Sequence, residues 1–127
     1  MNEENKNYGC SCGTKLVFAC SGAADVGAVA DQAARKMSRD GTGKMFCTAG
    51  LGGKVPAIIE TAQAACCIVA LDGCPADCVK LSLENAGFSE FIHLRVTDLG
   101  FEKGKTDVSD DTVTQVAEAA AEKNTCC

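Results

Sequence analysis

Short apolar runs alternate along this chain with longer stretches of helical spacing. Residues 15–20 and 66–71 form nearly continuous apolar runs, which are typical of strands buried on both faces of a parallel sheet. Residues 44–48 form a shorter run of the same kind. Residues 90–96 instead alternate between apolar and polar positions, as an edge strand with one solvated face does. The pattern therefore predicts four strands.

Each predicted strand is followed by a segment that has the features of a helix. In residues 26–37, apolar side chains recur at i, i+3, i+4, i+7 and i+11, which indicates one buried helix face. Prolines are tolerated in a first helical turn, so Pro56 opens the next predicted helix and Pro75 opens one over residues 75–86. The last helix is predicted to begin at Ser109 or Asp110, either of which can cap it.

Four strands that each precede a helix predict a parallel sheet with helices on both faces, because βα crossovers are right-handed. The two continuous apolar strands are expected in the centre, which gives the strand order 2-1-3-4. We therefore expect a three-layer α/β/α fold, flavodoxin-like or Rossmann-like. Residues 15–123 would form this domain, between a flexible N-terminal tail (1–14) and a C-terminal cysteine tail (124–127).

This topology predicts that four cysteines gather at one edge of the sheet. Cys20 ends the first strand, Cys47 ends the second, and Cys74 and Cys78 follow the third. The carboxyl ends of parallel strands lie at one edge, where such sheets bind ligands. Cys74 would cap the third helix, so Cys74 and Cys78 would share one helix face. Four thiolates suit a tetrahedral Zn²⁺ ion, although Cys20 and Cys47 could also be small buried hydrophobic residues.

Two other polar residues near this edge are open to more than one interpretation. Asp72, just before Cys74, is either a turn residue or a group that orients a ligand. His93 is the single histidine of the chain, and its mid-strand position predicts a place away from the cysteines.

The sequence around these cysteines resembles a known family. Asp72-Gly73-Cys74, with Cys78 four residues further on, looks like the signature of the DGC-domain family, a group of small proteins described as zinc-binding. The other matching stretches are residues 20–22, 47–53 and 97–100, the last followed by Lys103. The resemblance spans residues 15–123 in collinear order. It implies a zinc ion held by cysteines but no particular reaction.

Composition narrows the cellular setting and the partners. The chain has ten cysteines but no apolar signal segment at its start, and none of its apolar runs approaches 18 residues. We therefore expect a cytoplasmic protein with reduced thiols and no membrane contact. A net charge of −5 repels nucleic acid, and the lack of tryptophan disfavours stacking of bases or flavins. A metal ion is the expected partner, and a protein partner remains open.

These features predict a zinc-binding protein that stores, transfers or senses the metal, with no catalytic step. The alternative is a thiol redox or sulfur-transfer enzyme, with Cys74 as the nucleophile and Cys78 as the resolving cysteine. A third interpretation is a protein-interaction domain whose metal only holds loops together. The cysteines of the two tails are expected at the opposite edge of the sheet: Cys10, Cys12, Cys126 and Cys127. One hypothesis is that they form a second thiolate site, and the alternative is that they are oxidisable thiols in disordered termini.

Overall fold

The computed structural model describes residues 9–10 and 13–124. Four described segments form a parallel sheet in the order β3-β2-β4-β5: β2 (Gly13–Ala19), β3 (Lys44–Phe46), β4 (Cys67–Asp72) and β5 (Ile92–Arg95). This arrangement confirms the predicted order 2-1-3-4, with the alternating strand at an edge. A short segment, β1 (Gly9–Cys10), pairs antiparallel with the start of β2, which the sequence analysis did not predict.

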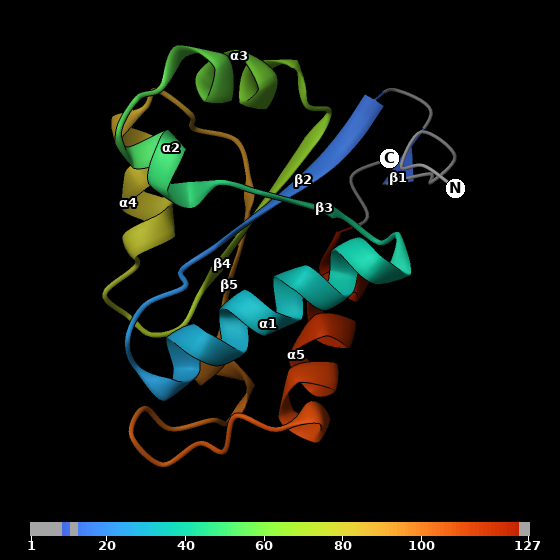
Figure 1. The fold of residues 1–127 in the computed structure, drawn as a ribbon, viewed down its shortest axis with the longest axis vertical. Helices are drawn as coiled ribbons and strands as arrows, with labels where there is room; N and C mark the ends of the chain where they lie inside the picture. The colour runs from blue at the N-terminus through green and yellow to red at the C-terminus, as the bar shows by residue number, and fades with distance from the viewer. Residues whose placement is uncertain (1–8, 11–12, 125–127) are drawn as a thin grey trace.

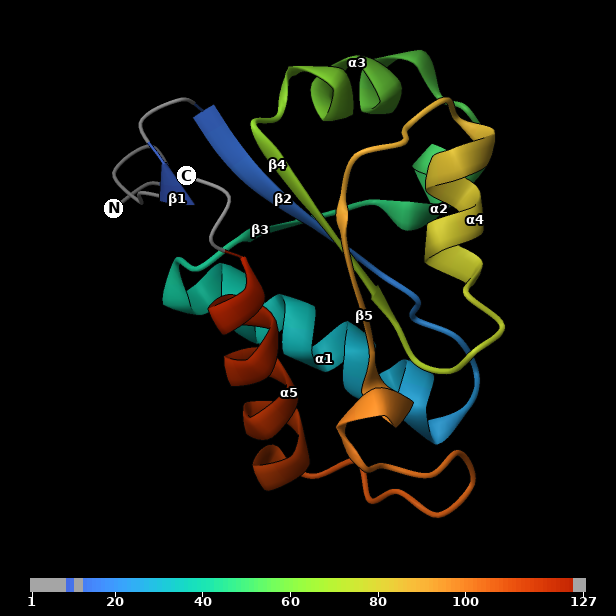
Figure 2. The same ribbon diagram turned by 180° about the vertical axis from the view of Figure 1, so that it is seen from behind.

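Helices cover both faces of the sheet, which confirms the three-layer α/β/α fold. The helical segments are α1 (Asp25–Asp40), α2 (Thr48–Gly52), α3 (Pro56–Ala64), α4 (Cys78–Asn85), the 3-10 helix η2 (Val96–Leu99) and α5 (Asp110–Lys123). Figures 1 and 2 show α1 and α5 on one side of the sheet and α2, α3 and α4 on the other. None of the helices in the described residues is long and apolar enough to span a lipid bilayer.

The helix ends follow from local chemistry. Gly41 ends α1 in the left-handed conformation, at φ 82°, which glycine adopts without a steric penalty. Ser109 caps α5 by accepting a hydrogen bond from the backbone N–H of Thr112 (3.3 Å), and acidic residues occupy the first turn, where the helix dipole favours them. Pro56 is the first residue of α3, as its fixed φ predicts.

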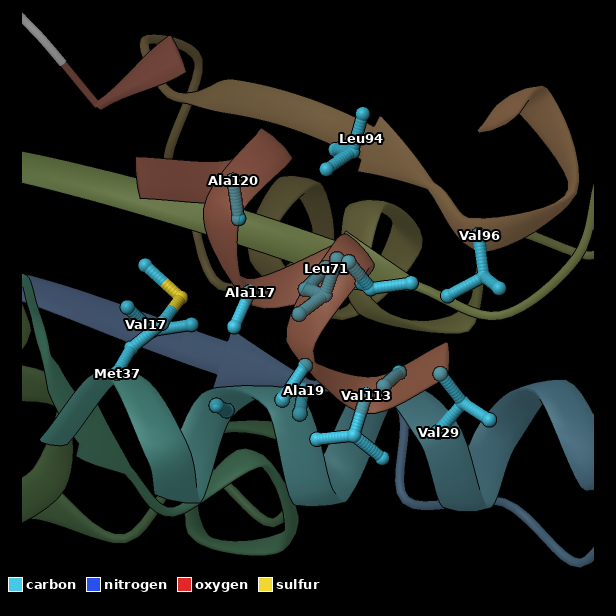
Figure 3. Close-up of a cluster of buried hydrophobic side chains, with 14 of the residues drawn as sticks. Val17, Ala19, Val29, Met37, Leu71, Leu94, Val96, Val113, Ala117 and Ala120 are labelled. Carbon is cyan, nitrogen blue, oxygen red and sulfur yellow. The ribbon is translucent and has the colours of Figure 1, made fainter. Parts of the chain in front are cut away.

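The two central strands supply a hydrophobic core to each face of the sheet. Val17, Ala19, Val69 and Leu71 point toward α1 and α5, and they form the cluster that Figure 3 shows in close-up. The alternate residues of the same strands pack with α2, α3 and α4 on the other face: Leu16, Phe18, Ile68 and Ala70. Burial on both faces explains why these two strands have continuous apolar sequences.

The first testable prediction concerns this core. Leu71 is 0% exposed, so Leu71→Ala should lower the free energy of unfolding by about 3 kcal/mol through lost burial and a residual cavity. Leu81, on α4, is 50% exposed and serves as the control, because Leu81→Ala should change stability by less than about 1 kcal/mol. Urea unfolding in reducing buffer measures both variants. Equal losses would contradict the assignment of Leu71 to the core.

Candidate metal centre

The four candidate cysteines all follow the carboxyl ends of strands. Cys20 comes directly after β2, Cys47 directly after β3, and Cys74 two residues after β4, whereas Cys78 is the first residue of α4. Cys20 and Cys74 are half-buried, and Cys47 and Cys78 are exposed. Figure 1 shows the ends of β2 and β4 and the start of α1 at the same corner of the molecule.

Two of the other cysteines carry charges that act on the thiol of Cys78. Burial raises the pKa of the Cys78 thiol above its ordinary value, and negative charge on Cys20, Asp72 and Cys74 raises it further. Cys20 and Cys47 line the same cleft next to α1. Three of the four cysteines are therefore linked through the charges around Cys78, and the fourth shares a cleft with one of them. We refer to the cluster of Cys20, Cys74 and Cys78 as the thiol rim.

Glycines allow the loops that carry the rim to touch through their backbones. A side chain at Gly73 would place its Cβ 2.9 Å from the backbone nitrogen of Gly27, at the start of α1. A Cβ at Gly27 would in turn lie 2.8 Å from the backbone nitrogen of Gly22. Real Cβ atoms do not approach backbone so closely, so only glycine fits. The loop after β4 can thus lie against the loop after β2, which carries Cys20.

The carboxylate of Asp72 fixes the start of α4. It is buried, with 1% of the residue exposed, and accepts the backbone N–H groups of Val79 (2.7 Å) and Lys80 (3.2 Å). It also accepts a hydrogen bond from Nε2 of His93 (2.8 Å). Asp72 therefore holds the first turn of α4, which begins with Cys78, against β4 and β5. This contact favours the interpretation of Asp72 as an orienting group.

The start of α4 differs from the sequence prediction. The helix begins at Cys78 and not at Pro75, and residues 75–76 form a turn. Asp77 precedes it in a left-handed conformation (φ 56°), and Arg95 holds its carboxylate through two hydrogen bonds of 2.7 Å. Cys74 thus lies in a turn outside the helix, and the expectation that it caps the helix and shares a face with Cys78 was wrong.

A positive charge reaches Cys74 from a different loop. Nζ of Lys103 lies 3.7 Å from Sγ of Cys74. Asp25, the first residue of α1, anchors this loop by accepting the backbone N–H groups of Gly104 and Thr106 at 2.9 Å each. These bonds lower the pKa of the Asp25 carboxyl. Asp25 thereby fixes the loop that brings the Lys103 ammonium group next to the Cys74 sulfur.

His93 lies closer to the rim than its sequence position suggested. It pairs in register with Ala70, and its ring contacts Asp72 as well as Asp77, whose Oδ1 is 3.5 Å from Nε2. The prediction that His93 lies away from the cysteine-bearing loops was therefore wrong. The alternation of residues 90–96 placed His93 and Arg95 on the same side of the strand. Only the register with β4 reveals that this side faces Asp72 and Asp77.

Within the described residues, one group of three metal-ligand atoms lies within 4.8 Å of one another: Asp72, Asp77 and His93. These groups already have partners, because Asp72 holds α4 and Asp77 binds Arg95. Within the described residues, the sulfurs of the thiol rim do not form such a group. Cys12, Cys126, Cys127 and the side chain of Cys10 lie outside the described residues, so the hypothesis of a second thiolate site stays untested.

The glycine contact generates a testable prediction. Gly73→Ala should lower the free energy of unfolding by about 1–3 kcal/mol, because its Cβ must push the backbone of α1 away. The control is Gly52→Ala in α2, where the nearest atom would be 3.9 Å from the new Cβ. Urea unfolding compares the two variants. A loss no larger for Gly73→Ala than for Gly52→Ala would refute the close approach of the two loops.

The ion pair before α4 predicts a dependence of stability on pH. The Arg95 hydrogen bonds hold the pKa of Asp77 below its usual value. A lowered carboxyl pKa stabilises the folded state above the pKa of the unfolded chain, and this stability is lost as the pH falls through the lower, folded value. Arg95→Gln should therefore destabilise the protein at pH 7, and its difference from wild type should shrink below about pH 4.

Urea unfolding at several pH values tests this expectation. Lys105→Gln is the matched control, since the ion pair of Lys105 with Glu102 is exposed on both sides and contributes little. A destabilisation by Arg95→Gln that stays constant from pH 7 to pH 3 would mean that Asp77 does not titrate with this pair.

Comparison with known proteins identifies the family. Residues 16–120 match the DGC domain. The chain is also 39% identical over 88 residues to the Anaerobic and virulence modulator AnvM of Pseudomonas aeruginosa, which covers 69% of this chain and 67% of that protein. No solved structure matches the chain. In the Asp72-Gly73-Cys74 triplet, Asp72 holds the start of α4, Gly73 allows a close backbone contact with α1, and Cys74 is one of the rim thiols. The family match and the relative show that the chain belongs to the DGC-domain family.

Proposed function

We propose that the protein binds Zn²⁺ through Cys20, Cys74 and Cys78, with Cys47 as the fourth ligand. The observation that carries this proposal is that all four cysteines follow the carboxyl ends of strands, and that two of them, Cys20 and Cys74, act electrostatically on Cys78. Zinc favours tetrahedral sites with thiolate ligands. Cys47 and Cys78 are exposed, so an ion from solvent can reach both sulfurs.

The charges at the rim support a bound cation. Burial raises the pKa of Cys78 most, and repulsion from the neighbouring sulfurs and carboxylate raises it further, so this thiol resists ionisation when nothing positive is bound. A divalent cation reverses this effect and stabilises the thiolates that ligate it. Asp72 and His93 would not bind the ion themselves. They would hold a ligand in position, because Asp72 accepts a hydrogen bond from His93 and fixes the turn of α4 that begins with Cys78.

The role of such a site would be to store, transfer or sense the metal. The relative whose name describes an anaerobic and virulence modulator supports a regulatory role over a catalytic one. Ligation by cysteine requires reduced thiols, so we place the protein in the cytoplasm. The acidic chain, with its charge of −5, argues for a metal ion or a protein as partner and against nucleic acid.

A second candidate function rests on a separate observation. The ammonium group of Lys103 lies beside the Cys74 sulfur, where it can donate a hydrogen bond to it. In this alternative, Cys74 attacks the sulfur of a disulfide substrate, the substrate's leaving thiolate takes a proton from water, and Cys78 then displaces the bound half to form a Cys74–Cys78 disulfide.

Metal analysis of the purified protein tests the first candidate and separates it from the second. Protein produced without added metal should carry about one zinc ion per chain, as expected for a four-ligand site. Cys20→Ser, Cys74→Ser and Cys78→Ser should each lose most of it. Cys66→Ser is the control, because Cys66 is a half-buried thiol next to the opposite end of β4 and should leave the zinc content unchanged.

Thiol counting provides the second measurement. A chelator should expose three or four additional reactive cysteines if zinc shields the proposed ligands. Metal-free protein that forms a reversible Cys74–Cys78 disulfide near the cytosolic potential would instead favour the redox function. The double variant Cys126→Ser, Cys127→Ser shows whether the C-terminal cysteines bind part of the metal.

A further inference from the structure

The end of α5 lies in a buried polar cluster at the edge of the sheet opposite the thiol rim. Asn124, which follows the helix, is 3% exposed. Its Nδ2 donates a hydrogen bond to the backbone oxygen of Thr42 (3.0 Å), and its backbone oxygen accepts one from Nζ of Lys15, which is also buried. The end of α5 is therefore fixed against β2 and the turn before β3.

Cys67, the first residue of β4, belongs to the same cluster. It pairs in register with Lys15 and is 7% exposed. Its Sγ lies 3.2 Å from Oδ1 of Asn124. Cys67 also takes part in a disulfide bond, whereas the cysteines of the thiol rim do not. The fold thus places a disulfide-bonded sulfur of β4 beside the residue that follows α5.

The C-terminal cysteines are close to this cluster along the chain. Cys126 and Cys127 follow Asn124 by two and three residues. Extended segments of these lengths span up to about 7 and 10 Å. A disulfide requires the two Cα atoms to lie within about 7 Å of each other. The segment after Asn124 is therefore long enough to bring either sulfur to Cys67.

The sheet keeps Cys10 away from Cys67. Cys10 ends β1, which pairs with Gly13 and Thr14 of β2. The other side of β2 is occupied there by the segment that leads into β4, because the backbone N–H of Cys66 donates to the oxygen of Thr14 (3.0 Å). β1 and β4 thus lie on opposite sides of β2. Two strand spacings, about 9.5 Å, exceed the distance that a disulfide bridges.

We propose that the disulfide of Cys67 joins it to a cysteine of the C-terminal pair, Cys126 or Cys127, and fastens the end of α5 to β4. The oxidant is a small-molecule disulfide of the glutathione class. The C-terminal thiol gives its proton to water and attacks one sulfur of the small disulfide, so that a mixed disulfide forms and one half leaves. The Cys67 thiol gives its proton to water and displaces the second half. Each departing thiolate takes up a proton, so the protein loses two electrons and the small disulfide becomes two thiols.

This bond and the proposed metal site use different cysteines at opposite edges of the sheet, so the inference does not depend on the proposed function. Disulfides in reducing compartments generally form in response to oxidation. The bond closes a loop of roughly 60 residues, which restricts the unfolded chain. Oxidation would therefore lock α5 onto the sheet and leave the thiol rim able to bind metal.

Peptide mapping without reduction tests the assignment in the full-length protein. The protein is incubated with oxidised glutathione, the remaining thiols are alkylated, and trypsin cleaves the chain. Cys67 then lies in residues 55–80, the C-terminal pair in residues 124–127, and Cys10 and Cys12 in residues 7–15. We expect residues 55–80 to be linked to residues 124–127, and a reductant to separate them. A link to residues 7–15 instead, or no link at all, would overturn the proposal.

Cys67→Ser should abolish this link, and its hydroxyl can still donate a hydrogen bond to Asn124. Cys66→Ser is the matched control, because it removes the neighbouring sulfur from the same peptide and should leave the link intact. Persistence of the link in Cys67→Ser, or its loss in Cys66→Ser, would show that Cys67 is not the bridged residue.

Deletion of residues 126–127 provides a second variant that leaves the buried cluster unchanged. Oxidised wild-type protein should unfold at a higher urea concentration than reduced protein, because the bond restricts the unfolded chain. The difference between the two forms should be smaller in the deletion variant. An equal difference in the wild type and the deletion variant would contradict a bond to the C-terminal pair.

Zinc analysis of the same proteins keeps this inference apart from the proposed function. Cys67→Ser should retain the zinc content of the wild type, whereas Cys20→Ser should lose zinc and retain the link between residues 55–80 and 124–127. Loss of zinc in Cys67→Ser would contradict the separation of the disulfide from the metal site.

Discussion

The carboxylate of Asp72 is almost completely buried, and hydrogen bonds must offset the free-energy cost of this burial. The arrangement of the thiol rim depends on these hydrogen bonds. A buried carboxylate without partners costs several kcal/mol. Here two backbone N–H groups of α4 and the ring of His93 provide the partners. Since these donors belong to α4 and β5, one side chain at the end of β4 fixes both elements. The position of Cys78 follows from this contact, because Cys78 begins the helix that Asp72 holds.

Two further contacts fix the other loops around the same point. The backbone contact at Gly73 brings the loop after β4 against the start of α1, and Asp25 at that start holds the loop that carries Lys103. The backbones that carry Cys20, Cys74 and Lys103 are therefore tied to one another.

The sheet could be predicted from the sequence because strands that are buried on both faces have continuous apolar sequences. The runs that became β2 and β4 are continuous and apolar, so their central place and the strand order followed. The start of α4 was mispredicted because the proline rule is local, whereas the contacts that set the helix start, Asp72 to Val79 and Asp77 to Arg95, join different elements. The same reason applies to His93, whose partner depends on the register between β4 and β5.

For the candidate site too, the sequence predicts which edge of the sheet the residues occupy but not the contacts that each residue makes. Topology alone was enough to place four cysteines at the carboxyl edge. It could not show that Cys47 caps the short helix α2, because five residues are too few for a periodic signal.

The two ends of this edge differ in electrostatics, and this difference argues for different chemistry at each. Around Cys78, burial and the negative charges of Cys20, Asp72 and Cys74 oppose ionisation of the thiol. Beside Cys47, the cleft carries charges of both signs, and Asp31 and Arg35 pair with each other there. Thiolates that lie close together repel one another, and a bound divalent cation offsets this repulsion. A cation would therefore stabilise the ionised form of Cys78, whereas an anion would oppose it.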